Sequence, residues 1–131
     1  MAEDVPRVRL ASVSPASPFV VRGDVLDPGI LRADAMRFFR RYPGWRRYGV
    51  SAYAAMDNLE VDAICEAKLE RFAAVAMIAR DEIERRGILV VPTFRGPHVT
   101  LAHEDLETLI DRLATCEHRS VPNRHHRQEG G

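Results

Sequence analysis

The chain has 131 residues, of which 46% are hydrophobic and 29% charged, with 19 basic side chains against 19 acidic ones. This length suits one ordinary globular domain, and no apolar run approaches the roughly 18 residues of a membrane-spanning helix. The apolar fraction excludes wholesale disorder, and zero net charge excludes a uniformly basic nucleic-acid-binding domain. Two cysteines, Cys65 and Cys116, make no disulfide framework, and no apolar signal segment follows the first methionine. The sequence therefore predicts a reduced, cytoplasmic protein that does not contact a membrane.

The zero net charge is an average over three unequal parts of the chain. Residues 1–48 carry nine arginines against five acids, residues 49–111 carry six basic groups against twelve acids, and residues 112–131 carry four against two. Only Lys68 among the basic residues is a lysine, a bias typical of a GC-rich, bacterial genome. Because the planar guanidinium pairs bidentately with phosphate and carboxylate, anion recognition by this chain would use arginine forks.

Both ends of the chain differ in composition from its middle. Residues 1–16 mix charges with Ser and Pro and contain one strand-like piece at residues 8–10, while residues 116–131 are poor in apolar side chains and end in Gly-Gly. Neither end can bury enough apolar surface to offset the entropy that ordering costs. The sequence therefore predicts a flexible leader over residues 1–16, one globular domain over residues 17–115 and a flexible tail over residues 116–131.

Strand and helix patterns alternate through the first half of that domain. Residues 19–23 are a short β-branched run, which predicts a strand. An Asp-Pro pair at residues 27–28 is typical of a helix start, and the helical apolar stripe that follows is ended by a Pro-Gly pair at residues 43–44. Residues 48–53 predict a second strand, after which Asn58 can cap a second helix.

Residues 59–87 allow two interpretations. They contain many helix formers, but one helix over this whole stretch would be far longer than the average of about a dozen residues. We prefer a break near Glu70, a buried strand over residues 72–78, and a short helix over residues 81–86 that Gly87 ends.

The last third of the domain predicts a hairpin and a final helix. Residues 88–91 form a buried apolar run, residues 95–97 a turn, and residues 98–101 an alternating partner strand. Glu104 or Asp105 then opens an amphipathic helix. Strands interleaved with helices predict a single α+β domain, with a small mixed β-sheet and a C-terminal hairpin packed by two to four helices.

Residues 36–48 have the most unusual local composition, because arginines are interspersed with aromatic residues there. Arginine forks beside exposed rings neutralise phosphates and stack on bases, as in many proteins that hold single-stranded nucleic acid. The candidate nucleic-acid-binding residues are Arg37, Arg40, Arg41, Trp45, Arg46 and Arg47. An acidic protein partner would fit the same cations. The alternative is an ordinary helix whose solvent face carries the arginines.

The predicted hairpin brings together a second group of residues with catalytic potential. His98 and Thr100 are two apart on a strand and share one face of the sheet, with Arg95 in the adjoining turn. An imidazole moves protons near neutral pH, a guanidinium stabilises developing phosphate charge, and a hydroxyl orients either group. His98-x-Thr100 resembles one half of the paired His-x-Thr motifs of the two-histidine phosphoesterases, although this chain has no second copy. The alternative is a structural strand histidine.

A third pattern joins the first two predicted strands. Arg22 at the end of the first strand and Ser51 within the second resemble the Arg and Ser positions of the Arg-Ser-Glu type of ADP-ribosyltransferase. The resemblance implies that Arg22 holds a phosphate of the cofactor and that a late glutamate is catalytic. Glu104 and Glu107 fall at a predicted helix start instead of that family's strand-end pattern, so the acid is unassigned.

Other catalytic and ligand-binding signatures are not found in this sequence. It contains no Walker A loop, no Rossmann glycine pattern, no nucleophile elbow and no His-Glu-x-x-His. Cys116 and His118 with His125 and His126 have the right atom types for zinc, but they lie in a polar tail without a Cys-x-x-Cys pair. The sequence therefore indicates no metal site and no cofactor.

Two classes of function remain open. The first is a small bacterial enzyme, toxin-like and directed at RNA or a nucleotide, with His98 as acid or base, Arg95 as anion stabiliser and Thr100 as an orienting hydroxyl. As part of a toxin–antitoxin pair it would bind a cognate acidic or DNA-binding protein. A weaker form of the enzyme hypothesis is an ADP-ribosyltransferase-like domain that uses Arg22 and Ser51. The second class is a non-enzymatic interaction module that binds a partner or another copy of itself.

Overall fold

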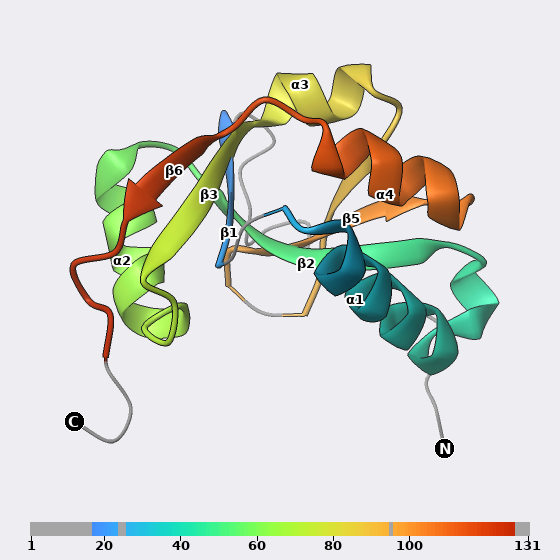
Figure 1. Ribbon diagram of the computed structural model, residues 1–131, viewed down its shortest axis with the longest axis horizontal. Helices are drawn as coiled ribbons and strands as arrows, with labels where there is room; N and C mark the ends of the chain where they lie inside the picture. The colour runs from blue at the N-terminus through green and yellow to red at the C-terminus, as the bar shows by residue number, and fades with distance from the viewer. Residues whose placement is uncertain (1–16, 24–25, 95, 128–131) are drawn as a thin grey trace.

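The computed structural model describes residues 17–23, 26–94 and 96–127 (Figure 1). Its strands are β1 (Phe19–Arg22), β2 (Tyr48–Ala55), β3 (Ala74–Ala79), β4 (Leu89–Pro92), β5 (His98–His103) and β6 (Arg119–Pro122). Its helices are α1 (Pro28–Arg41), the 3-10 turn η2 (Pro43–Trp45), α2 (Asn58–Lys68), α3 (Arg80–Arg85) and α4 (Leu106–Ala114). The strands form one sheet in the order β4-β5-β2-β1-β3-β6.

The predicted α+β class is confirmed, but the direction of the strands differs from the mixed sheet that we expected. Every strand pair described in the sheet is antiparallel. β2 and β3, which a helix connects, are not neighbours in the sheet, because they pair with opposite edges of β1. The strands that run parallel to each other are therefore separated by an antiparallel one.

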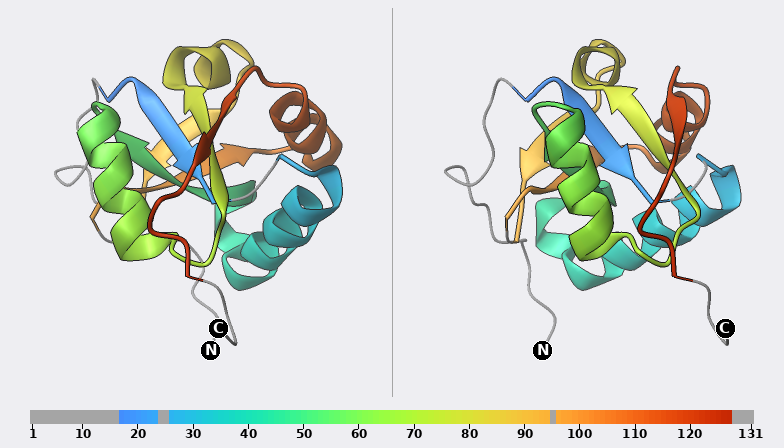
Figure 2. Two further views of the ribbon diagram at one scale, coloured as in Figure 1. Left: turned by 60° about the vertical axis from the view of Figure 1, so that its left-hand side comes forward. Right: turned by 90° about the vertical axis from the view of Figure 1, so that its left-hand side faces the viewer.

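Helices cover both faces of the sheet, so its central strands are buried on both sides (Figure 2). One apolar cluster joins α1, α3 and α4 to the sheet through side chains such as Leu31, Ile83 and Leu109. The other joins α2 to the opposite face through side chains such as Val61 and Ile64. β1 supplies one fully buried valine to each cluster, which explains why its sequence is a continuous apolar run rather than an alternating one.

Local sequence signals place the helix starts. The Asp27 carboxylate accepts a hydrogen bond of 3.0 Å from the Ile30 amide, and Pro28 occupies the first turn of α1. Asp105, one of the two expected starting residues, caps α4 by accepting from the Thr108 amide at 2.9 Å. α2 begins at Asn58, with Asp57 as its cap. These carboxylates satisfy amides that otherwise lack a partner in the first turn.

The preferred break in residues 59–87 is confirmed. α2 ends at Lys68, β3 occupies the expected buried run, and α3 follows directly. Gly87 has a φ of 78°, the left-handed conformation expected after a helix end. The run from Val75 to Ile78 is buried, and β3 lies between β1 and β6 in the sheet. One long helix over residues 59–87, the alternative interpretation, is therefore wrong.

The predicted boundary at residue 116 is wrong. Cys116 is buried, and β6, within the expected tail, pairs with β3 over four residues. Asn123 follows β6 and is 7% exposed, and its side-chain amide donates to the Leu69 carbonyl at 2.9 Å and the Phe72 carbonyl at 3.0 Å. Backbone pairing and one buried amide therefore replace the apolar side chains that the tail lacks.

Two other expectations concern the ends and the membrane. The strand-like piece at residues 8–10 and the leader over residues 1–16 lie outside the described residues. Within the described part of the chain, no helix combines the length and apolar character needed to cross a membrane.

We expect the substitution Asn123→Ala to lower the free energy of unfolding by about 1–3 kcal/mol, because it leaves two buried carbonyls without their donor. Chemical denaturation followed by circular dichroism measures this change. Arg119→Ala, on the exposed side of β6, is the matched control and should change stability by less than about 0.5 kcal/mol. Equal stability of the two variants would contradict the structural role assigned to residue 123.

Candidate functional site

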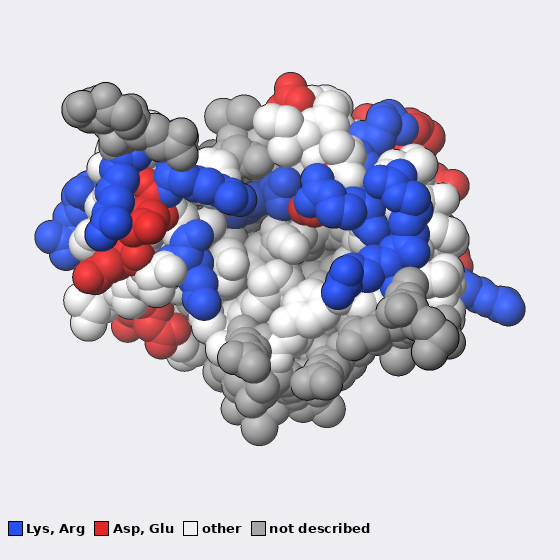
Figure 3. Space-filling view, turned by 90° about the horizontal axis from the view of Figure 1, so that it is seen from below, with Lys and Arg blue, Asp and Glu red and all other residues white. Residues whose placement is uncertain are grey.

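A cleft of about 580 Å³ opens at the end of β1, between α1 and the end of α2. Arg22 is the last residue of β1, whereas β2 continues beyond it, and α1 packs against this free part of β2. The cleft is lined by Arg22, Gly23, Asp27, Gly29, Ile30, Ala33, Asp34, Arg37, Ser51, Tyr53, Lys68, Leu69, Arg71, Phe72 and His98. Figure 3 shows this side of the molecule, where Lys and Arg side chains flank a hollow of uncharged residues.

His98 lies in the cleft in a fixed orientation. It pairs with Tyr53 across β5 and β2, and the two rings meet edge to face with centroids 5.4 Å apart. The Nδ1 atom of His98 lies 2.9 Å from the Thr93 hydroxyl oxygen, which lies 2.8 Å from the hydroxyl oxygen of Thr100. The Nε2 atom makes no hydrogen bond within the described part of the chain, so this nitrogen is available for proton transfer.

Thr100 contacts His98 only indirectly. It is 1% exposed and does not line the cleft, and its hydroxyl bonds to that of Thr93. Thr93 is fully buried, and among the described residues its hydroxyl is the only side-chain hydrogen-bond partner of the Nδ1 atom. Thr100 therefore positions His98 through Thr93 rather than facing a substrate.

Burial sets the protonation of the two rings. Desolvation lowers the pKa of His98, and the charge of Lys68 lowers it further, while a hydrogen bond that the ring donates to the Thr93 backbone and the charge of Asp34 act in the opposite direction. Burial raises the pKa of Tyr53, partly offset by the charge of Arg71. At neutral pH the cleft therefore holds a neutral imidazole beside a protonated phenol.

Arg22 and Ser51, which only a faint pattern joined in the sequence, are in contact. Arg22 is 8% exposed, and its Nη1 atom donates to the Ser51 carbonyl at 2.7 Å and to the Asp34 carboxylate at 3.0 Å. The same carboxylate oxygen accepts from the Ser51 amide at 3.2 Å. The Ser51 side chain is exposed, and its hydroxyl makes no hydrogen bond to the described residues. His98, Arg22 and Ser51 therefore converge on one cleft.

Three further cations surround the opening of the cleft. Arg37 projects from α1 with 69% of its side chain exposed, at 3.6 Å from Asp34. Lys68 ends α2, and the Arg71 guanidinium lies over the Phe72 ring at 4.8 Å from its centroid. The two lining carboxylates, on Asp27 and Asp34, are already engaged by the α1 amide and by Arg22. The cleft is therefore suited to an anionic ligand.

Other predicted residues lie outside the cleft. Arg95 falls outside the described residues, so its proximity to His98 stays a prediction. Arg40, Arg41, Arg46 and Arg47 lie on or after α1 but do not line the cavity. Trp45 is half-buried, with its ring 5.6 Å from that of Phe38.

Sequence reasoning missed most of the cleft's rim. Tyr53 could have been found, since it is two residues from Ser51 on the same predicted strand and so shares its face. Asp34, Lys68 and Arg71 carried no such signal, because each lies in an element that only tertiary packing brings to the end of β1.

Metal binding gains no support from the histidines near the C-terminus. His118 bonds to the Cys116 carbonyl, whereas His125 lies 3.1 Å from the Asp62 carboxylate on α2. Within the residues that the structure describes, no three His, Cys, Asp or Glu side chains are grouped so that they could hold a metal ion. Burial also raises the pKa of the Cys116 thiol, which disfavours the thiolate that a metal would need.

The substitution Tyr53→Ala is expected to raise the pKa of His98 toward the usual value of about 6.5, because water then reaches the imidazole and stabilises its charged form. Titration of the His98 ring by NMR measures the change. Tyr48→Ala is the control, since the Tyr48 ring stacks on Phe39 and is not part of the cleft. A His98 pKa that does not respond to loss of the Tyr53 ring would show that burial beside this ring is not the cause.

Comparison with known proteins leaves the site to be interpreted from its own chemistry. No family model matches the chain, and neither the curated proteins nor the solved structures contain a match.

Proposed function

We propose that the protein is a small enzyme that acts at a phosphate ester of RNA or of a nucleotide, with His98 as the general base. The observation that carries the proposal is the convergence of His98, Arg22 and Ser51 on one cleft with a cationic rim. A neutral imidazole that is fixed at Nδ1 and open at Nε2 is the form that accepts a proton. The cations Arg37, Lys68 and Arg71 can hold the phosphate and stabilise the charge that develops on it.

The reaction step can be written for RNA. The Nε2 atom of His98 accepts the proton of a 2′-hydroxyl as its oxygen bonds to the neighbouring phosphorus. The bond from phosphorus to the 5′-oxygen breaks, and that oxygen takes a proton, for which the Tyr53 hydroxyl is the candidate donor within the cleft. The products are a cyclic phosphate and a free 5′-hydroxyl, and solvent then restores both side chains. In this scheme Thr93 and Thr100 are positioning residues for His98.

ADP-ribosyl transfer is a second candidate, favoured by the direct contact between Arg22 and Ser51. The resemblance to the Arg-Ser-Glu transferases would then assign Arg22 to a phosphate of the donor dinucleotide. The chain departs from that family at the acid, because Glu107 pairs with Arg32 at the start of α4 and neither Glu104 nor Glu107 lines the cleft. We include in the first proposal, the RNA- or nucleotide-directed enzyme, a role as a bacterial toxin that binds a cognate protein partner.

We expect His98→Ala to reduce turnover by about a hundredfold or more, the usual contribution of a general base. The purified variant and wild type are compared on end-labelled single-stranded RNA and on labelled NAD⁺. His126→Ala is the control, since His126 follows β6 and is not among the cleft residues.

In the wild type, activity should rise with pH through a midpoint below that of free imidazole, because only the neutral ring accepts a proton and burial lowers its pKa.

The substrates separate the candidate functions. RNA cleavage that depends on His98 supports the phosphodiester reaction, and consumption of NAD⁺ that depends on Arg22 supports ADP-ribosyl transfer. Activity that His98→Ala leaves unchanged would refute the proposed base. A wild-type protein that binds RNA without turning over either substrate would leave the interaction module as the function.

A further inference from the structure

We infer that the cleft receives one segment of a single-stranded nucleic acid whose backbone continues along α1 and η2, rather than a free nucleotide. This inference rests on the proposed function of the cleft and narrows its substrate to a polynucleotide. The surface concerned, here named the arginine track, consists of Arg37, Arg40, Arg41, Arg46 and Arg47.

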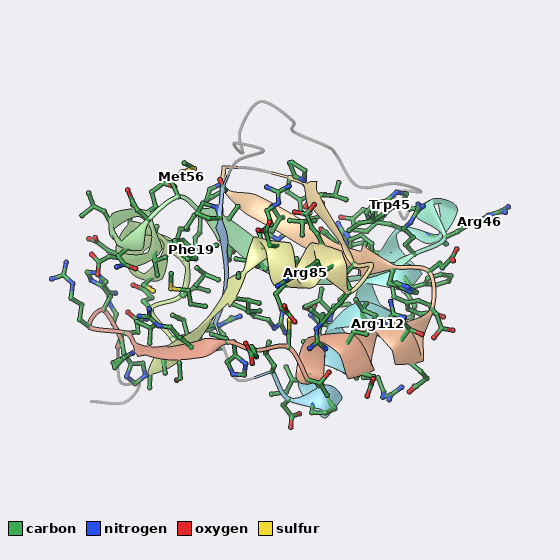
Figure 4. All side chains as sticks on the ribbon, turned by 90° about the horizontal axis from the view of Figure 1, so that it is seen from above. Phe19, Trp45, Arg46, Met56, Arg85 and Arg112 are labelled. Atoms are coloured by element: carbon green, nitrogen blue, oxygen red, sulfur yellow. The ribbon has the colours of Figure 1, made fainter. Side chains whose placement is uncertain are left out.

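The arginine track begins in the cleft and leads away from it. Arg37 lines the cavity, and Arg40 and Arg41 follow three and four positions later, on the same face of α1. η2 then places Arg46 and Arg47 beyond the end of the helix. Figure 3 shows that the Lys and Arg side chains beside the hollow continue across this side of the molecule, and Figure 4 shows Arg46 projecting outward from the turn.

Several cations of the track have no counter-ion close to them. Arg40, Arg46 and Arg47 form no ion pair within the described part of the chain. Four exposed arginines elsewhere, Arg32, Arg85, Arg124 and Arg127, each face a carboxylate. Three others, Arg71, Arg112 and Arg119, are exposed without an ion pair among the described residues, but they are not grouped along one short stretch of the chain as the arginines of the track are. Repulsion among uncompensated like charges is relieved by an anionic ligand, which is how neutralised phosphates contribute to binding.

The half-buried Trp45 ring beside the track favours nucleic acid over an acidic protein. The Arg47 guanidinium lies over the Trp45 ring at 5.7 Å from its centroid, and this ring is only half-buried. The Arg41 guanidinium lies 5.8 Å from the centroid of Tyr42, to whose hydroxyl it also donates at 3.2 Å, but Tyr42 is buried, so its ring supports the arginine and is closed to a base. A partly exposed ring beside a guanidinium group, as at Trp45 and Arg47, is typical of surfaces that stack single-stranded bases, whereas an acidic peptide needs only the cations.

Binding measurements with the full chain test the inference. The variant Arg40→Gln/Arg46→Gln/Arg47→Gln is compared with wild type in fluorescence anisotropy titrations of a labelled 12-nucleotide RNA, across a range of salt concentrations. We expect weaker binding, and a slope of log affinity against log salt that is smaller by about 2, since each single-strand phosphate contact contributes about 0.7. Binding of a labelled mononucleotide should not change, because these three residues lie outside the cleft.

Matched controls define the outcomes. Arg85→Gln/Arg119→Gln/Arg127→Gln removes the same charge from exposed positions off α1 and should leave the RNA slope unchanged. An equal loss of RNA affinity in both triple variants would show that only net charge matters and would overturn the inference. RNA affinity that is unchanged in the track variant would overturn it as well. Polyglutamate that binds as tightly as RNA, with the same dependence on the track, would also overturn it in favour of an acidic protein partner.

The two proposals fail separately. Loss of turnover in His98→Ala with intact RNA binding supports both the proposed base and a track that binds independently of it. Turnover that depends on His98, combined with an unchanged KM for the 12-nucleotide RNA in the track variant, would overturn the track and leave the proposed function standing.

Discussion

A buried guanidinium at the end of β1 holds together the three elements that shape the cleft. Arg22 joins β1 to the Asp34 carboxylate on α1 and to the Ser51 carbonyl on β2, while Asp34 also accepts from the Ser51 amide. A charge buried this deeply is tolerated only when it is paired and hydrogen-bonded. The arrangement therefore fixes where α1 crosses the part of β2 that extends past β1, and with it the position of one wall of the cleft.

Burial also sets the protonation of the two rings in the cleft, His98 and Tyr53. His98 and Tyr53 face each other across two neighbouring strands, and partial removal from water lowers the pKa of the imidazole and raises that of the phenol. The buried hydroxyls of Thr93 and Thr100 fix the ring without supplying charge. Polar atoms in a dry environment interact more strongly than in water, so this small network fixes the orientation of the His98 ring.

The three parts of the sequence that differ in charge differ also in how many of their charges form ion pairs. Much of the acidic middle of the sequence is neutralised locally: Glu82 pairs with Arg85 and Arg86, and Arg80 pairs with Glu84. The basic C-terminal part adds the pairs Arg124 with Asp62 and Arg127 with Glu70, and the hydrogen bonds from Arg124 and His125 hold the pKa of Asp62 well below its usual range. Among the described residues up to 48, the arginines have fewer such partners, and Arg22 and Arg37 line the cleft.

Local signals in the sequence determined the elements: the cap at Asp27, the break before β3, the left-handed Gly87 and the alternation that places His98 and Thr100 on one face. These depend on neighbours within a few residues, and so they could be predicted. The sequence also indicated His98, Arg22 and Ser51 as separate candidates. Only the tertiary structure decided that they share a cleft, that Asp34, Tyr53, Lys68 and Arg71 complete it, and that β6 extends the sheet. Those outcomes depend on strand order and on which helix packs over which strand, and such long-range contacts leave no local pattern in the chain.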